Sequence, residues 1–226
     1  MNCLVACEES QAITKQLRRL GHNAFSCDLQ KCSGGFPEWH IAGDCLPLLD
    51  GFVNFTVENG ESYCIGSKWD LIIAHPPCTY LSFAGNKYFN VEKYGDKAIE
   101  RMKQRDLAAE FFMKVWAADC EHLVIENPVG YMNSVFRKPD QIINPFQFGD
   151  CDRKRTCLWV RGVPLLVPDY VSPAPVPYEI TPGGYKKYFV DMKHSKYRGK
   201  ERSKTFDGIA RAMAYQYTCN FLMDMI

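Results

Sequence analysis

The run Trp69-Asp70-Leu71-Ile72-Ile73-Ala74-His75-Pro76-Pro77-Cys78 constrains the fold more than any other stretch of the chain. Its apolar centre has the length and composition of a buried β-strand. The two prolines that follow fix φ and remove two backbone donors, so the strand must end there in a loop. Ligands of open α/β sheets bind at the carboxyl ends of the strands, which makes the Cys78 thiol a candidate reactive group. The alternative is a cysteine packed as a small hydrophobe behind the strand.

A second strand of the same kind is expected over Glu121–Pro128, where apolar residues give way to Glu126, Asn127 and a proline. Between the two strands, apolar residues recur at helical spacing from Tyr94 to Asp119, which predicts one long helix. A strand-helix-strand crossover makes two strands parallel. Cys78 and Glu126 are therefore expected at one edge of one sheet. The alternative for Glu126 is a solvated strand end.

The rest of the chain repeats this alternation. Strands are expected over Asn2–Ala6, His22–Cys27 and Thr156–Arg161. Helices are expected over Ser10–Leu20, with Ser10 as N-cap and Gly21 as the stop, and over Phe206–Met223. Residues 43–68 are less regular, with a turn around Asn59-Gly60. Such alternation predicts an α/β fold, a mostly parallel sheet with helices on both faces. The expected division is a catalytic α/β domain over 1–162, a Pro/Gly-rich and basic region over 163–204, and a helix over 205–226 that returns to the first domain.

Composition narrows the class of protein. No stretch approaches 18 uninterrupted apolar residues, so no membrane span is expected. Eleven scattered cysteines, an odd number without a Cys-x-x-Cys pair, favour free thiols in a cytosol over disulfides or a structural zinc site. The net charge is only +1, yet residues 185–204 carry eight lysines and arginines against two acids, a local net of +6. A basic stretch interleaved with tyrosines suits nucleic acid. A solvated loop is the alternative.

The chain resembles the DNA cytosine (carbon-5) methyltransferases, and most closely their short phage and prophage branch. The matching pieces run in order along nearly the whole chain: Leu4-Val5-Ala6-Cys7-Glu8, Gly21-His22, Ser26-Cys27-Asp28-Leu29, His75-Pro76-Pro77-Cys78-Thr79-Tyr80-Leu81-Ser82, Glu126-Asn127-Pro128, Phe148-Gly149, Thr156-Cys157-Leu158-Trp159 and Arg202-Ser203-Lys204-Thr205-Phe206. The resemblance implies a Rossmann-like fold that binds S-adenosyl-L-methionine, with DNA as partner and a bacterial host cytosol as location. It leaves the oligomeric state open.

The resemblance also implies the roles of individual residues. The catalytic set is Cys78 as nucleophile at carbon-6 of a flipped cytosine, Glu126 as hydrogen-bond donor to ring nitrogen-3, and Arg155. The donor site comprises Asp28 for the ribose, Asp44 for the adenine, and Glu8, Glu9, Ser10 and Pro76. The DNA contacts are Pro77, Asn127, Arg153, Lys154, Thr156, Lys186, Lys187, Lys196 and Arg198. No metal is implied.

Two departures from the family pattern, and one segment that fits two patterns, leave choices open. The turn after the first strand, Ala6 to Ser10, contains none of the glycines usual in S-adenosylmethionine enzymes. Glu8 or Glu9 then either contacts the donor's amino group or favours the helix N-terminus through its dipole. Ile209 replaces an asparagine usual in the C-terminal motif, which leaves a modified donor open. Before the last strand, either Arg153 and Arg155 or Lys154 and Thr156 face the site, because alternate residues of a strand point to opposite sides.

Three other functions compete with this interpretation. An amino methyltransferase is disfavoured, because His75 and Cys78 stand where that class has an acid or amide and an aromatic residue. An RNA cytosine methyltransferase can use the same site. A catalytically idle phage DNA-binding protein of the same fold is disfavoured by the presence of both Cys78 and Glu126.

Overall fold

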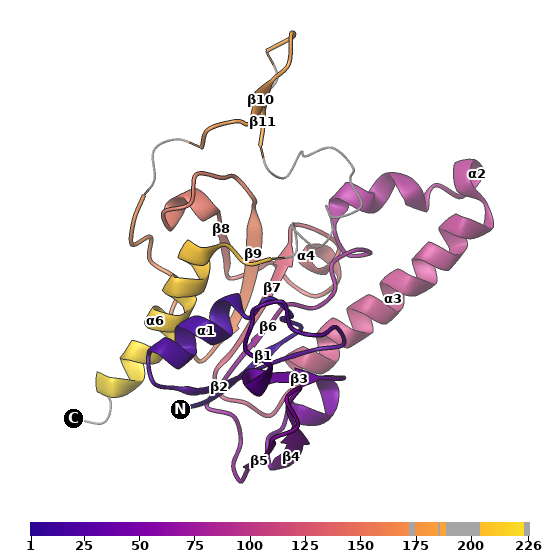
Figure 1. Ribbon diagram of the computed structural model, residues 1–226. Coiled ribbons are helices and arrows are strands. Elements are labelled where there is room, and N and C mark those ends of the chain that lie inside the picture. Colours follow the sequence, from indigo (N-terminus) through magenta and orange to yellow (C-terminus); the bar gives the residue numbers. More distant parts are fainter. Residues whose placement is uncertain (172–174, 185, 189–203, 224–226) are drawn as a thin grey trace.

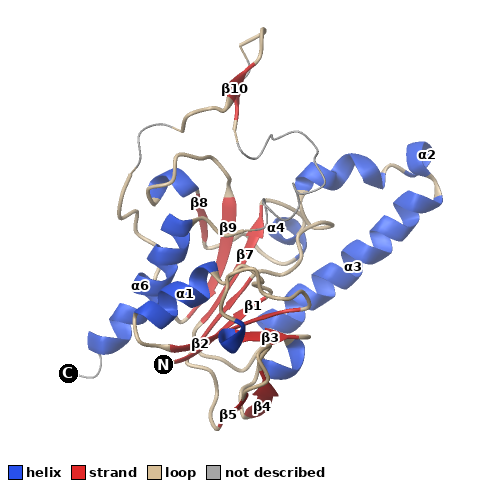
Figure 2. Cartoon of the chain, viewed as in Figure 1, coloured by secondary structure: helices blue, strands red, loops and turns tan. Residues whose placement is uncertain are grey.

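The computed structural model describes residues 1–171, 175–184, 186–188 and 204–223, and within them it shows an α/β fold (Figures 1 and 2). Seven strands of this part form a central sheet in the order β3-β2-β1-β6-β7-β9-β8. Their bounds are β1 Asn2–Ala6, β2 Asn23–Asp28, β3 His40–Ala42, β6 Leu71–Ala74, β7 Leu123–Pro128, β8 Gln141–Ile143 and β9 Thr156–Arg161. The pairs among β3, β2, β1, β6 and β7 are parallel, and β9 is antiparallel to both β7 and β8. The mostly parallel α/β sheet is confirmed.

The order of the strands creates one switch point. From β1 the chain moves outward to β2 and β3, and then returns to the other side of β1 to form β6. The connections after β1 and β6 therefore leave the sheet in opposite directions, and ligands of open α/β sheets bind at the carboxyl ends of strands at such a switch point. The Pro-Pro-Cys loop directly follows β6 at this point.

Helices cover both faces of the sheet, as the sequence predicted (Figure 2). On one face, α1 (Ala12–Arg19) and α6 (Asp207–Met223) pack through residues such as Leu17 and Met213 against Val5 and Ile73. On the other face, α3 (Asp96–Trp116) packs through Phe112 and Val115. The shorter elements are α2 Val91–Tyr94, α4 Met132–Val135, the hairpin β4 Val53–Thr56 with β5 Ser62–Ile65, and the pair β10 Glu179–Ile180 with β11 Lys186–Lys187.

Two predicted helices differ from the observed ones in their boundaries. The long helix begins at Asp96 rather than Tyr94 because Gly95, at φ 51°, separates it from α2, and it ends at Trp116. The first helix begins at Ala12, and Ser10 is not its N-cap. The N-cap is Gln11, which makes no capping side-chain bond, and the Glu8 carboxylate accepts from the N–H groups of Ile13 and Thr14 instead.

The stop of the first helix is confirmed in detail. Gly21 has φ 85°, a left-handed conformation that costs glycine little. Its N–H donates to Arg18 O and the N–H of His22 donates to Leu17 O, the paired bonds of a Schellman ending. No helix of the described residues has the length and apolar character needed to cross a membrane.

Candidate functional site at the carboxyl edge of the sheet

The carboxyl ends of the parallel strands gather most of the predicted site residues at one edge. Ala6 and Ala74 end β1 and β6 side by side, and Ile125 lies beside Ala74 in β7, which continues to Pro128. The Pro-Pro-Cys loop and Glu126 therefore leave neighbouring strands at the same edge, as the predicted crossover required. Because β9 runs the other way, it begins at this edge, with Thr156 opposite Pro128.

The loop that carries Cys78 is tied to the end of β7. The buried Asn127 side chain donates through Nδ2 to Pro76 O at 2.8 Å. Beyond the prolines, the Cys78 carbonyl accepts from the N–H groups of Leu81 and Ser82, which closes a turn. Pro76 is buried, Pro77 is exposed and Cys78 is half-buried. The thiol thus stands on a fixed loop outside the core. Asn127, assigned to substrate contact from the sequence, has its amide nitrogen committed to this loop.

The next segment joins the two loops a second time. Tyr131 N donates to Leu81 O at 2.7 Å, and Ser82 bridges to Gly130. The backbones approach so closely that a Cβ on Gly130 would meet Leu81 O at 2.0 Å. This position therefore requires glycine, and the packing holds the Cys78 loop against the segment that follows Glu126.

Glu126 is paired with His75, a residue outside the set of predicted site residues. His75 Nδ1 lies 3.2 Å from Glu126 Oε2, with side-chain exposures of 10% and 16%. Burial opposes the charged form of Glu126, but the hydrogen bond from His75 and the positive charges of Lys154 and His75 outweigh it, so the pKa of this carboxyl lies below its ordinary value. The clue in the sequence was a titratable residue immediately before the prolines, one strand away from a carboxylate.

The turn after β1 adopts a glycine-like backbone without any glycine. Cys7 and Gln11 have φ values of 60° and 55°, a left-handed conformation uncommon for residues with a Cβ. Gln11 is held there because its buried side chain donates to Phe36 O and accepts from Phe36 N. Such backbone strain persists only where the surroundings fix it, and it is enriched at functional sites.

Glu8 and Glu9 are both buried behind this turn. The Glu8 carboxylate accepts from Ile13 N and from both the N–H and the hydroxyl of Thr14. Burial raises the pKa of Glu8 although the charge of His75 and these bonds oppose the rise. These contacts of Glu8 fit the second interpretation, in which the carboxylate stabilises the N-terminus of α1. Ser10 is half-buried beside them.

The two aspartates assigned to the donor lie at the ends of neighbouring strands. Asp28 is the last residue of β2, is half-buried, and accepts from its own loop through Oδ1 at Gln30 N. Asp44 follows β3 by two residues, is exposed, and accepts from Leu46 N. Asp28 O also accepts from Gly43 N, which joins the two strand ends. Carboxylates at these ends can meet the hydroxyls and amine of a nucleoside.

The residues before β9 divide by exposure. Arg153 and Arg155 are exposed, Lys154 is half-buried and Thr156 is buried. The charge of Lys154 acts on Glu126, and Thr156 Oγ1 donates to Lys154 O. The guanidinium of Arg153 lies 5.9 Å from the Tyr188 ring. Arg153 and Arg155 are thus the exposed pair, and Lys154 is the member of the other pair whose charge acts on Glu126.

The basic segment predicted to contact DNA is described only in part. Lys186 and Lys187 form β11, and Lys187 Nζ lies 2.8 Å from Glu179 Oε1. Lys196 and Arg198 lie outside the described residues. Ile209, which replaces the expected amide, is buried between α6 and the sheet.

Known proteins add no assignment to this geometry. No family model matches the chain, and no curated protein matches it.

Among the described residues, no group of three or more histidine, cysteine, aspartate or glutamate side chains is arranged to hold a metal ion.

Proposed function

We propose that the protein is a DNA cytosine-5 methyltransferase that uses S-adenosyl-L-methionine. The observation that carries the proposal is the coupled geometry at the ends of β6 and β7. A Pro-Pro-Cys loop is fixed by Asn127 to the strand that presents Glu126. Nucleophilic catalysis at a pyrimidine needs a thiolate that attacks the ring carbon and a hydrogen-bond donor that meets the ring nitrogen, both held on the same side of the sheet edge.

In the proposed reaction each group has one task. The Cys78 thiolate attacks carbon-6 of the cytosine, which makes carbon-5 nucleophilic. Glu126 donates to nitrogen-3 and stabilises the negative charge that develops on the ring. After alkylation, loss of the carbon-5 proton and of the Cys78 sulfur restores the aromatic ring. The base must leave the duplex stack to reach the half-buried thiol.

We assign the donor to the ends of β1, β2 and β3. The left-handed turn at Cys7 re-aims the chain after β1 as a glycine would, and Asp28 and Asp44 supply carboxylates at the next two strand ends. We assign Asp28 to the ribose hydroxyls and Asp44 to the adenine amine. When bound, the donor supplies an electrophilic methyl group.

A cationic and aromatic surface next to the Cys78 loop supports a nucleic-acid substrate. The Arg101 guanidinium lies about 5 Å from the rings of Tyr80 and Phe89, and it donates to Thr79 O, one residue after Cys78. Arg105 stacks between Phe89 and Tyr131 at 4.1 and 4.3 Å. A pocket on this surface is lined by Tyr80, Tyr88, Tyr94, Lys97, Glu100, Arg101 and Gln104. Alternating aromatic rings and cations are suited to unstacked bases and phosphates.

The proposal is tested by trapping the covalent intermediate. Wild-type protein is incubated with DNA containing 5-fluorocytosine and with S-adenosyl-L-methionine labelled in the methyl group. Fluorine blocks removal of the carbon-5 proton, so a denaturant-stable protein–DNA species that carries the label is expected. Cys78→Ala should form none, whereas the matched control Cys64→Ala, an exposed cysteine on the β4–β5 hairpin, should match wild type.

Two outcomes would contradict the proposal. An adduct formed equally well by Cys78→Ala removes Cys78 as the nucleophile. Label transferred to a 5-fluorocytosine RNA of the same sequence, but not to the DNA, assigns the same site to RNA instead.

A further inference from the structure

The pair of His75 and Glu126 is rigidly placed. His75 directly follows β6 and Glu126 lies in β7, one residue beyond the aligned pair Ala74 and Ile125. The backbone N–H of His75 donates to Ala6 O at 2.9 Å, which also fixes it against β1. The two side chains are mostly buried and meet at 3.2 Å. The imidazole therefore has a fixed position between three strand ends.

Charged and titratable groups approach the pair from the neighbouring elements. From the turn after β1, Glu8 interacts with His75. From the loop before β9, Lys154 interacts with Glu126. Cys157 lies on β9 opposite β7. Burial raises the pKa of its thiol, the Glu126 carboxylate adds to the rise, and Asn133 and Arg155 oppose it. His75 thus interacts with two carboxylates, and its Nε2 is buried without a hydrogen-bond partner among the described residues.

The proposed reaction needs a proton that Glu126 does not hold by itself. A carboxyl whose pKa lies below its ordinary value is ionised at neutral pH, when it can only accept hydrogen bonds. To donate a hydrogen bond to nitrogen-3, the Glu126 carboxyl must carry a proton during the reaction. The imidazole of His75 is in contact with Glu126 Oε2 through Nδ1, and an imidazolium carries a proton on both ring nitrogens.

We propose that His75, as an imidazolium, holds the proton that Glu126 delivers to ring nitrogen-3. This inference rests on the proposed function. As the Cys78 sulfur bonds to carbon-6, the Nδ1 proton moves to Glu126 and the carboxyl proton moves to nitrogen-3, leaving a neutral imidazole. When the sulfur leaves as thiolate, the proton returns by the same route. His75 acts through Glu126 and is a positioning residue that also sets the protonation of its partner.

The pH dependence of His75→Gln tests this role. The glutamine side chain can still donate one hydrogen bond to Glu126 but cannot hold a titrating proton. The rate of adduct formation with 5-fluorocytosine DNA is measured from about pH 6 to about pH 8 for wild type, His75→Gln and the control His22→Gln, which alters a histidine at the other end of the sheet. The ratio of His75→Gln to wild type should fall about tenfold or more as the pH rises, because the variant loses its single proton at a lower pH.

A structural role alone predicts a different result. If His75 only held the loop in place, the ratio would be the same at every pH, and that outcome overturns the inference while leaving the proposed function intact. Wild type that forms no adduct overturns the proposed function and the proton transfer together.

A second measurement does not depend on activity or on the folding of His75→Gln. The imidazole of His75 is titrated by NMR in wild type and in Glu126→Gln. Removing the carboxylate should lower the pKa of His75 by about one unit or more, because an adjacent opposite charge favours the protonated form. An unchanged His75 titration shows that the pair does not share a proton and overturns the inference.

Discussion

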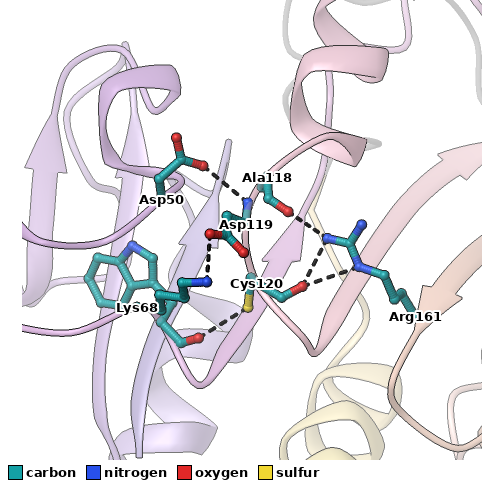
Figure 3. A network of polar contacts seen from close by, with 7 residues as sticks. Asp50, Lys68, Ala118, Asp119, Cys120 and Arg161 are labelled. Carbon is teal, nitrogen blue, oxygen red and sulfur yellow. Dashed lines mark hydrogen bonds and ion pairs between the residues drawn. The ribbon is translucent and has the colours of Figure 1, made fainter.

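The two edges of the central sheet differ in how their polar groups are paired. At the amino ends of β6 and β7, polar groups are paired. Arg161 donates to the carbonyls of Ala118 and Cys120, and Asp119 meets both Lys68 and Asp50 (Figure 3). Arg161 also donates to Trp116 O. At the carboxyl ends of the same strands, His75 Nε2 and Asn127 Oδ1 are buried without hydrogen-bond partners among the described residues.

This difference separates the two tasks of the fold. Buried polar atoms are normally hydrogen-bonded, so exceptions need an explanation. The network in Figure 3 joins the end of α3 to β9 and to the connections before β6 and β7, and it serves stability. The carboxyl edge combines unpaired polar atoms with the left-handed Cys7, and each has a free-energy cost that a bound substrate can offset. Mutations at the two edges should therefore affect different properties.

The largest effect is expected at the carboxyl edge. Glu126→Gln keeps an oxygen for His75 but cannot pass a proton to the substrate. Turnover should fall by about 10²–10³, the usual loss when one preorganised donor is removed. DNA affinity and thermal unfolding should change little. Single-turnover methyl transfer measures the loss of rate, and calorimetric unfolding of the same sample measures the change in stability. Activity near that of wild type would show that Glu126 is only a solvated residue at the end of a strand.

The second effect is expected at the opposite edge. Arg161→Ala removes four hydrogen bonds to three carbonyls at the end of α3 and the start of β7. The free energy of unfolding should fall by about 2–3 kcal/mol, because partly buried carbonyls lose their partner. Arg161→Lys, whose ammonium lacks the planar fork, should recover only part of this. Urea unfolding measures the loss, and the adduct rate of the folded fraction should equal that of wild type. A slowed adduct rate would mean that the two edges are coupled.

A matched pair of glycines compares the edges directly. A Cβ on Gly130 would meet Leu81 O at 2.0 Å, and one on Gly162 would meet Glu121 O at 2.2 Å. Either alanine variant should lose about 1–3 kcal/mol of stability, the usual cost of overpacking, and Gly162→Ala should lose more because Gly162 also has φ 67°. Only Gly130→Ala should also slow the adduct reaction in the folded fraction, since Leu81 follows Cys78 by three residues. Equal adduct rates in the two variants would show that the Cys78 loop does not need its contact with Gly130.

The sequence predicted those parts of the fold whose signals are local. Strands β1 and β9 occupy their predicted residues because each is a continuous apolar run between clear breaks. The β4–β5 hairpin and β8 were missed, although the Asn59-Gly60 turn was predicted. Their strands have three or four residues, some of them exposed, and pairing with a partner strand rather than a local pattern defines them.

In the candidate site, too, only the features with local sequence signals were predicted. The shared edge of Cys78 and Glu126 followed from the crossover alone. The contact of His75 with Glu126 depends on which strand lies beside which, and the cap of α1 by Glu8 depends on the path of a strained turn. The role of Arg161 requires α3 and β7 to meet it from elsewhere in the chain. Contacts of this kind are set by tertiary packing, so residue spacing does not reveal them.

The smallest effect is expected for the ion pair at the rim of the network. Lys68 Nζ and Asp119 Oδ2 are 2.6 Å apart, but their side chains are 53% and 66% exposed. Water and salt screen such a pair, so Lys68→Ala should lower the free energy of unfolding by less than about 1 kcal/mol, and the difference should vanish in high salt. Asp119 N donates to Asp50 Oδ1, which does not depend on Lys68. A salt-independent loss as large as that of Arg161→Ala would mean that stability at this edge comes from the charge network as a whole rather than from the guanidinium on its three carbonyls.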